Sequence, residues 1–291
     1  MNRVGLRLLL GVVLLVPTAA PGQHVSASDS AKKTMFTARD ATTAGVITAT
    51  SAVISIFDER IARWTQTPRV QGGSSRQDAA DALTTINEVP LTIAAGATWA
   101  IGRLTGQRTV ADIGLHTGEA LVLTLTAAEI VRGTLGRMRP RVSPDDSYDF
   151  QYGKGFTEFD ARSYPSIHSA VAFTVAAALS EEIRHRKPGA ARIAAPLLYG
   201  AALVPGITRM YLNQHWTSDI VAGAALGALI GDRIVHYTHT HRPSRLDRAL
   251  LRVAVLPDGR IGVVASLWAA GAQDDPEKKL RGPTHSTGSD P

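Results

Sequence analysis

The chain has 291 residues, 44% of them hydrophobic and 19% charged, which is enough for one large domain or two small ones. It contains no cysteine, so disulfides, thiolate metal sites, cysteine nucleophiles and a bacterial lipoprotein anchor are excluded. Its formal net charge is +6, and a basic chain suits phosphate-bearing ligands or an anionic membrane surface without singling out either one.

Residues 1–27 have the pattern of an export signal. Arg3 and Arg7 form a positive start, and the apolar core runs from Leu8 to Val16. Small residues between positions 18 and 27 offer several alternative cleavage sites. An uncleaved anchor helix is the alternative interpretation. We therefore predict an exported protein of the periplasm or cell envelope.

Six apolar stretches predict the core helices of an all-α helical bundle, which we place in a domain of residues 28–245. They are residues 41–57, 89–101, 119–131, 169–183, 190–204 and 220–237. Their uncharged stretches mostly run about 11 to 18 residues, whereas a full membrane span needs about 20. We therefore favour a soluble or peripherally attached bundle over a six-pass membrane protein.

The segments between and after these helices differ in kind. The polar, glycine-containing stretch from Arg69 to Asp81 is expected to be a loop. Val142 to Ser163 is a long irregular connection, and such connections are more often functional than idle. Alternating apolar residues around the turn Pro257-Asp258-Gly259 predict a small C-terminal β-hairpin extension over residues 246–272. The polar residues 273–291 are expected to be a disordered tail.

The stretch from Thr208 to Asp219 carries the first candidate active-site residues. Arg209 is followed by His215 six residues on, and by Asp219 four residues after that. If Asp219 lies in the first turns of the next helix, it is a neighbour of His215 on one face, and its carboxylate can accept the imidazole Nδ1–H. This leaves Nε2 as a nucleophile, while Arg209 offers a planar cationic fork for an oxyanion such as phosphate.

A basic stretch upstream supplies two more cations. Arg132 and Arg139 are seven residues apart, or two helical turns, so both guanidinium groups can lean to one side of a helix that Pro140 is expected to stop. A basic helix end that complements the helix dipole is the simpler interpretation of this stretch alone.

A third stretch, residues 163–169, opens the following helix. Pro165 is expected in the first helical turn, where no amide donor is lost, so Ser166 and His168 lie at the positive helix end. Such an end is a ready-made anion site. Together the three stretches supply cations for phosphate oxygens, a nucleophile and a proton donor, which is the set that phosphoryl transfer requires.

In order and spacing, the three stretches resemble the signature of the type 2 phosphatidic acid phosphatase superfamily, which includes bacterial acid phosphatases and vanadium haloperoxidases. The family pattern is Lys-x6-Arg-Pro, then Pro-Ser-Gly-His, then Ser-Arg-x5-His-x3-Asp, and the resemblance covers about residues 40 to 240. The resemblance implies that His215 is the nucleophile that forms a phosphohistidine, Asp219 its orienting partner and His168 the general acid. It also implies a set of phosphate-binding residues, which are Arg132, Arg139, Ser166 and Arg209.

Three positions depart from the family pattern. Arg132 stands where the family has Lys, Thr208 where it has Ser, and Ile167 where it has Gly. The first two departures keep the charge or the size class. A glycine amide approaches phosphate closely, so the β-branched side chain of Ile167 is expected to crowd the site or alter substrate choice.

These observations lead to the hypothesis of a metal-independent phosphatase that acts on phosphomonoesters or lipid phosphates. It would need no cofactor and no nucleic-acid partner, and membrane association is a further expectation. One alternative is a vanadium-dependent haloperoxidase, in which the same side chains hold vanadate as a cofactor. Another is an inactive envelope protein of the same fold. The short chain, with no obvious additional domain, favours the phosphatase.

The histidines near the end of the last predicted helix invite a metal-site hypothesis. His236, His239 and His241 lie close together in the sequence but have no carboxylate at ligand spacing. A solvated basic helix end is therefore favoured, and we predict no metal site. His116 and His185 have no partner that the sequence identifies.

Overall fold

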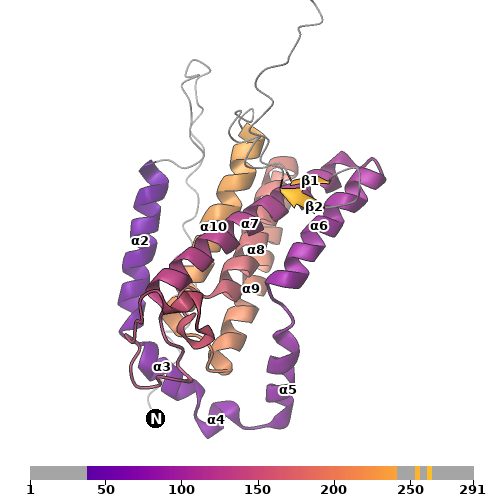
Figure 1. The fold of residues 1–291 in the computed structure, drawn as a ribbon. Helices are drawn as coiled ribbons and strands as arrows, with labels where there is room; N and C mark the ends of the chain where they lie inside the picture. The colour runs from indigo at the N-terminus through magenta and orange to yellow at the C-terminus, as the bar shows by residue number, and fades with distance from the viewer. Residues whose placement is uncertain (1–37, 241–252, 256–260, 264–291) are drawn as a thin grey trace, which may run out of the picture. The chain divides into compact units, whose positions relative to one another are not determined.

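The computed structural model of the chain describes residues 38–240, 253–255 and 261–263. Residues 38–240 form helices joined by short connections and one long irregular segment (Figure 1). In chain order the helices are α2 (Ala38–Ser55), α3 (Asp58–Thr65), α4 (Pro68–Gln71), α5 (Ser74–Leu83), α6 (Glu88–Leu104), α7 (Arg108–Leu135), α8 (Ile167–Arg186), α9 (Pro188–Tyr211) and α10 (Thr217–Thr240). Two 3₁₀ helices, η2 (Lys154–Phe156) and η3 (Phe159–Ala161), lie between α7 and α8. The predicted helical bundle is confirmed in this part of the chain.

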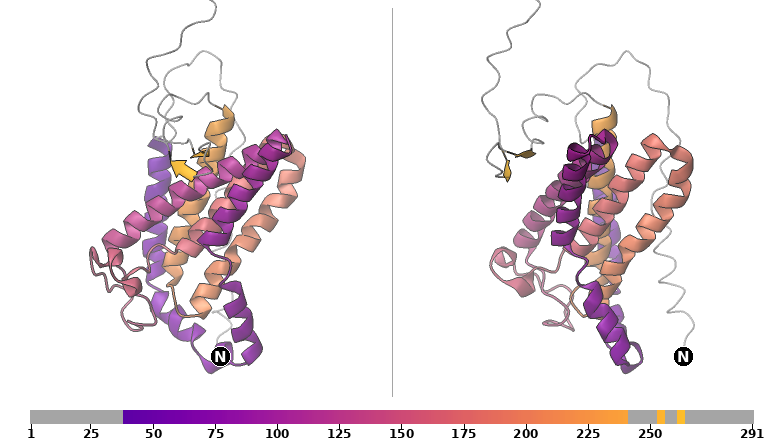
Figure 2. Two further views of the ribbon diagram at one scale, coloured as in Figure 1. Left: turned by 45° about the vertical axis from the view of Figure 1, so that its right-hand side comes forward. Right: turned by 90° about the vertical axis from the view of Figure 1, so that its right-hand side faces the viewer.

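Helix α8 is the most buried helix of the bundle and packs against α10, α9 and α7. The three views in Figures 1 and 2 show α8 running alongside these helices. Most of its buried residues are Ala, Ser, Thr or Val. Because these side chains are small, neighbouring backbones come close on several sides of α8, as expected of a core helix rather than an amphipathic surface helix.

The contact between α8 and α10 depends on glycines at four-residue spacing. A Cβ atom on Gly223 would lie 2.2 Å from the backbone oxygen of Ser166, and one on Gly227 would lie 2.0 Å from that of Ala170. No larger residue fits at either position unless a backbone moves. Since residues four apart share one helix face, these glycines hold the start of α8 against the start of α10, where predicted catalytic residues lie.

Helix α7 extends beyond both ends of the predicted stretch 119–131. Gly136 follows the helix in a left-handed conformation, with a φ of 62°, and forms its C-terminal cap. The prediction that Pro140 stops this helix is therefore wrong, because a glycine ends it earlier. As a consequence, Arg139 lies in the irregular segment and not on the helix that carries Arg132.

The two predicted connections have different outcomes. The stretch from Arg69 to Asp81 is mostly helical, so the loop prediction is wrong. Pro68 stands at the first position of α4, and only Gly72 and Gly73 separate α4 from α5. The connection from Val142 to Ser163 is irregular apart from its short 3₁₀ helices, as predicted.

Part of the predicted chain organisation falls beyond the described residues. Within the predicted hairpin extension, β1 (Val253–Val255) and β2 (Ile261–Val263) pair antiparallel. The rest of residues 246–272 lies outside the described residues, so the extension stays a prediction. The signal peptide of residues 1–27 and the tail of residues 273–291 also lie outside them, and the bounds of the 28–245 domain stay predictions.

Length and composition make α9 a candidate membrane span. Helices α2 and α3, which are bent by 58° at their junction, would count as a second candidate if taken together. Only 17% of the apolar window of α9 is buried within the described structure.

Candidate active site

The predicted site residues come together where the ends of four helices meet. The ring centroids of His168 and His215 are 6.1 Å apart, and three arginines are close enough for their charges to lower the pKa of His168. The predicted site residues come from the end of α7, the segment after it, the start of α8, the end of α9 and the start of α10. They are Arg132, Arg139, Ser166, His168, Arg209, His215 and Asp219.

His215 is prepared for nucleophilic attack by its hydrogen bonding. It is 2% exposed, and its Nδ1 lies 2.8 Å from the backbone oxygen of Ser163. Because a carbonyl oxygen only accepts, Nδ1 carries the proton. Nε2 is buried and has no hydrogen-bond partner among the described residues. Burial lowers the pKa of His215 to about 4, so the ring is neutral at pH 7 with an open lone pair on Nε2.

Asp219 supports His215 through the turn before α10 rather than by a direct hydrogen bond. Its Oδ2 lies 3.6 Å from His215 Nδ1, which suits an ion pair with a charged ring but is too long for a hydrogen bond. Oδ2 instead accepts from the Trp216 N–H at 2.8 Å and from the Ser163 hydroxyl at 2.5 Å. The expectation that Asp219 takes the imidazole Nδ1–H is corrected, because the Ser163 carbonyl does so.

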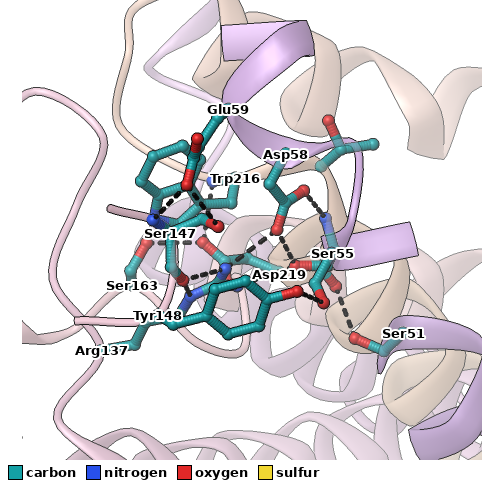
Figure 3. A network of polar contacts seen from close by, with 12 residues as sticks. Ser51, Ser55, Asp58, Glu59, Arg137, Ser147, Tyr148, Ser163, Trp216 and Asp219 are labelled. Carbon is teal, nitrogen blue, oxygen red and sulfur yellow. Dashed lines mark hydrogen bonds and ion pairs between the residues drawn. The ribbon is translucent and has the colours of Figure 1, made fainter. Parts of the chain in front are cut away.

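Arg137, to which the sequence analysis assigned no role, holds Asp219 in place (Figure 3). Its NH1 donates to Asp219 Oδ1 at 2.6 Å, and its NH2 donates to Asp58 Oδ2 at 2.9 Å. Its Nε also donates to the backbone oxygen of Ser147 at 2.8 Å. Burial alone would raise the pKa of Asp219, but the guanidinium of Arg137, together with His215 and the Ser163 hydroxyl, outweighs burial and lowers that pKa. The carboxylate behind the nucleophile is therefore kept ionised.

His168 lies beside the nucleophile, with 6.1 Å between the centroids of the two rings. Its Nε2 is 3.9 Å from Glu88 Oε2, and its Nδ1 is buried without a hydrogen-bond partner in the described part of the chain. Burial, followed by the positive charges around it, lowers the pKa of His168 to about 2. A bound phosphate offsets these cations and so favours the protonated ring that a general acid needs.

The three arginines are held by hydrogen bonds that do not use all their donors. Arg132 donates to the carboxylate of Glu129 at 2.9 Å, and Arg139 to the side chain of Gln214 at 2.6 Å. Arg209 donates to a backbone oxygen at 3.3 Å. A guanidinium has five N–H donors, so each arginine can still donate to a phosphate oxygen. Burial, together with neighbouring arginines, lowers the pKa of Arg139 to about 10. A bound anion has the opposite effect, because its negative charge stabilises the charged guanidinium.

The start of α8 differs in two respects from the prediction. Ser166 is the N-cap residue, whose Oγ accepts from the Ser169 N–H at 3.5 Å, so Pro165 precedes the cap and does not lie in the first turn. Ile167 is 4% exposed and packs in a core cluster with Leu121. The expectation that the Ile167 side chain crowds the phosphate is corrected, because this side chain faces the hydrophobic core.

Three residues at the site were not predicted from the sequence. Asp58 directly follows the first predicted helix, and Glu88 directly precedes the second. Charged residues at helix boundaries are common, so neither position carried a distinctive signal. Arg137 lies between Arg132 and Arg139, and its place in this basic stretch is the one feature that pointed toward the site.

Part of the chain is similar to known proteins. Residues 114–243 match the family model of the PAP2 superfamily, and this region contains every predicted site residue. A segment of 72 residues is 42% identical to a lipid A 1-phosphatase of Porphyromonas gingivalis. That segment is 25% of this chain and only 15% of the relative, so the chain spans a small part of the relative's length.

One solved structure is also similar to the chain. It is described as the crystal structure of the first transmembrane PAP2 type phosphatidylglycerolphosphate phosphatase from Bacillus subtilis. The match covers 70% of this chain and 99% of that chain, with 18% identity and a TM-score of 0.45.

Proposed function

We propose that the chain, whose residues 114–243 match the family model of the PAP2 superfamily, is a phosphatase of the bacterial cell envelope that acts through a phosphohistidine on His215. The observation that carries the proposal is the buried Nε2 of His215, which has no hydrogen-bond partner among the described residues and lies among arginines. The substrates are phosphomonoesters, including lipid phosphates. The partial identity to a lipid A 1-phosphatase supports a lipid substrate.

In the first step, a bond forms between His215 Nε2 and phosphorus while the bond from phosphorus to the leaving oxygen breaks. Donors on Arg132, Arg139 and Arg209 stabilise the charge on the phosphate oxygens. His168 gives its proton to the leaving alcohol. The Asp219 carboxylate, 3.6 Å away, stabilises the positive charge that His215 gains.

In the second step, water attacks phosphorus and His168 takes a proton from it. The bond between phosphorus and Nε2 breaks, which releases phosphate and restores the neutral His215. His215, His168, Asp219 and the arginines supply every protein group that these two steps use. We therefore propose that the reaction requires neither a metal ion nor an organic cofactor.

Membrane association is part of the same proposal. Helix α6 exposes Ile93 at 65% and Leu104 at 87%, and α9 exposes Ile193 at 71% and Leu197 at 69%. Several large apolar side chains exposed on one helix are unusual for a soluble monomer and favour contact with lipid or protein. Extraction of cell membranes with high salt and then with detergent tests this, and release without either treatment would contradict it.

The catalytic proposal is tested by phosphate release from p-nitrophenyl phosphate and from phosphatidate, with EDTA present and with or without vanadate. We expect turnover in EDTA, inhibition by vanadate and an acid-labile phosphoenzyme that is absent from the His215→Asn variant. Vanadate-dependent halide oxidation would instead indicate the haloperoxidase. A folded chain that hydrolyses neither ester would be an inactive envelope protein.

A further inference from the structure

Six ionisable side chains gather at the other end of the helices that build the candidate active site. We call them the histidine–glutamate cluster; they are His116 of α7, Glu181, Glu182 and His185 of α8, and His236 and His239 of α10. Glu182 is fourteen residues beyond His168 on α8, so the cluster lies about 20 Å from the candidate active site.

The cluster corrects the sequence-based interpretation of these histidines. Along α10, Asp232 lies four residues before His236 but contacts Arg184, whereas α8 supplies the two carboxylates that the histidines approach in space. His116 and His185, which had no identified partner, also contact these carboxylates. His241 lies outside the described residues.

One carboxylate oxygen of Glu182 is shared by two imidazole rings. His116 Nδ1 lies 2.5 Å from Glu182 Oε1, and His239 Nε2 lies 3.1 Å from the same oxygen. The other oxygen, Oε2, accepts from Arg186 Nε at 2.9 Å. The side chain of Glu182 is 1% exposed, and those of His116 and His239 are 14% and 24% exposed. Three potential ligand atoms from three helices therefore converge in a largely enclosed place.

Glu181 repeats this arrangement one residue earlier. His185 Nε2 lies 3.0 Å and His236 Nδ1 lies 3.4 Å from Glu181 Oε1. These rings are 28% and 46% exposed, and Arg184 also contacts the Glu181 carboxylate. The ring of His185 stacks on that of His239, with 4.5 Å between centroids. Each set has an arginine beside its carboxylate, but the second set is more exposed, so it is the weaker of two adjacent sets.

The spacing suits a tetrahedral metal ion. Bonds of about 2.0–2.1 Å from zinc to nitrogen or oxygen place neighbouring ligand atoms about 3.3 Å apart. The contacts of 2.5 Å and 3.1 Å to Glu182 Oε1 are within 1 Å of this value. The ligand atoms of each set all lie within 4.8 Å of one another. Small outward movements of the rings are enough to admit an ion.

A further buried carboxylate stands one helical turn from His116. Glu119 is 9% exposed, and its Oε2 has no hydrogen-bond partner among the described residues. Contacts with histidine and arginine account for the buried carboxylates of Glu181 and Glu182, whereas Glu119 Oε2 has no such contact among the described residues. Carboxylates close behind the ligands of a metal site commonly orient those ligands.

We propose that the histidine–glutamate cluster binds a divalent transition-metal ion of the zinc type, with His116, Glu182 and His239 as the tighter ligand set. Two imidazoles and one carboxylate form a ligand set that such ions accept, and water completes the coordination. The ion joins α7, α8 and α10 at the end away from the phosphate chemistry. Its effect is therefore on stability, and the proposal does not depend on the proposed function.

The test uses the full-length chain, freed of metal with EDTA and then dialysed. We titrate it with Zn²⁺ by calorimetry and with Co²⁺ by visible absorption, and we measure Tm with and without Zn²⁺. We expect binding with a Kd on the order of 1 μM or tighter and a Tm increase of several degrees. His116→Ala and His239→Ala should each weaken binding at least tenfold, whereas His236→Ala should keep the tight site.

The matched control is His215→Asn, which changes a buried histidine at the opposite end and should keep Zn²⁺ binding and the Tm increase. Circular dichroism shows whether each variant is folded. Unchanged affinity in folded His116→Ala and His239→Ala, or no Tm change with 100 μM Zn²⁺, would overturn the proposal and leave a hydrogen-bond network. Phosphate release is unaffected by that outcome, so the two proposals fail separately.

Discussion

The two ends of α7, α8 and α10 use histidine in opposite ways. At the candidate active site, His215 donates its Nδ1–H to a backbone carbonyl, and Nε2 is left without a hydrogen-bond partner among the described residues. In the histidine–glutamate cluster, His116 and His239 direct a ring nitrogen at one buried carboxylate oxygen. A carbonyl fixes the tautomer and adds no charge, whereas a carboxylate adds a charge that a cation can share. The group that each histidine contacts, and not the helix that carries it, determines whether the ring suits nucleophilic attack or metal binding.

The balance of positive and negative charge also differs between the two ends. Around His168 the arginines outnumber the carboxylates that contact them, and their charges lower the pKa of its ring. In the cluster, Arg186 and Arg184 each contact two carboxylates, one of them a buried carboxylate of α8 that two histidines also approach, so carboxylates outnumber arginines there. One end is therefore prepared for an anion and the other for a cation.

The largest expected effect comes from removing Nε2 of His215. His215→Asn should lower kcat by a factor on the order of 10⁶, because no neighbouring group can form the covalent bond in its place. His239→Asn, at the cluster end, should leave kcat within about twofold. Initial rates on phosphatidate with both variants, checked for folding by Tm, measure the contrast. A His215→Asn loss below tenfold would place the nucleophile elsewhere.

The next effect concerns the buried charges behind the nucleophile. Arg137→Met leaves Asp58 and Asp219 buried without their shared cation, so the free energy of unfolding should fall by about 3–5 kcal/mol. The control is Arg63→Met, whose side chain is 58% exposed and whose carboxylate partners Glu59 and Asp145 are 33% and 83% exposed, with an expected loss of about 1 kcal/mol or less. Urea unfolding compares them. Equal losses would contradict the assigned role of Arg137.

Local sequence patterns predicted the helices and the residues that gather at the candidate active site. Apolar runs identified the core helices because burial is a property of each stretch by itself. Motif spacing identified His168 and His215 because each motif lies within one helix start. The contact between Arg137 and Asp58 joins residues 79 positions apart, and no local pattern contains both. Such partners become visible only when the helices are packed.

The same limit explains the errors at Ile167 and at the cluster histidines. The family pattern has glycine at position 167, but spacing does not show whether its replacement faces the phosphate or the core. His116 meets Glu182 across 66 positions, so spacing within α10 alone gave an apparently solvated helix end. Residues that act across helices therefore could not be predicted from the periodicity of one helix.

The smallest expected effect is a pH dependence of stability that has opposite signs at the two ends. The pKa is lowered to about 2 for His168 and to about 4 for His215, mainly by burial, against about 6.5 for an unfolded histidine. Between pH 6.5 and 4, the unfolded state therefore binds protons that the folded state does not. Each histidine lowers the free energy of unfolding by about 1.4 kcal/mol per pH unit as the pH falls.

At the cluster end, burial raises the pKa of Glu119 to about 7, so the folded state keeps a proton that the unfolded state releases above about pH 4.3. This term stabilises the protein as the pH falls and partly cancels the histidine terms. Urea unfolding of the metal-free chain between pH 4.5 and 7 should show a shallower slope for His168→Asn and a steeper one for Glu119→Gln, each by about 1.4 kcal/mol per pH unit. Saturating phosphate should act like His168→Asn, because the bound anion raises the pKa of His168. An unchanged slope in His168→Asn would mean that this ring already takes up its proton in the empty folded state, and the contrast between the two ends would then not extend to their protonation.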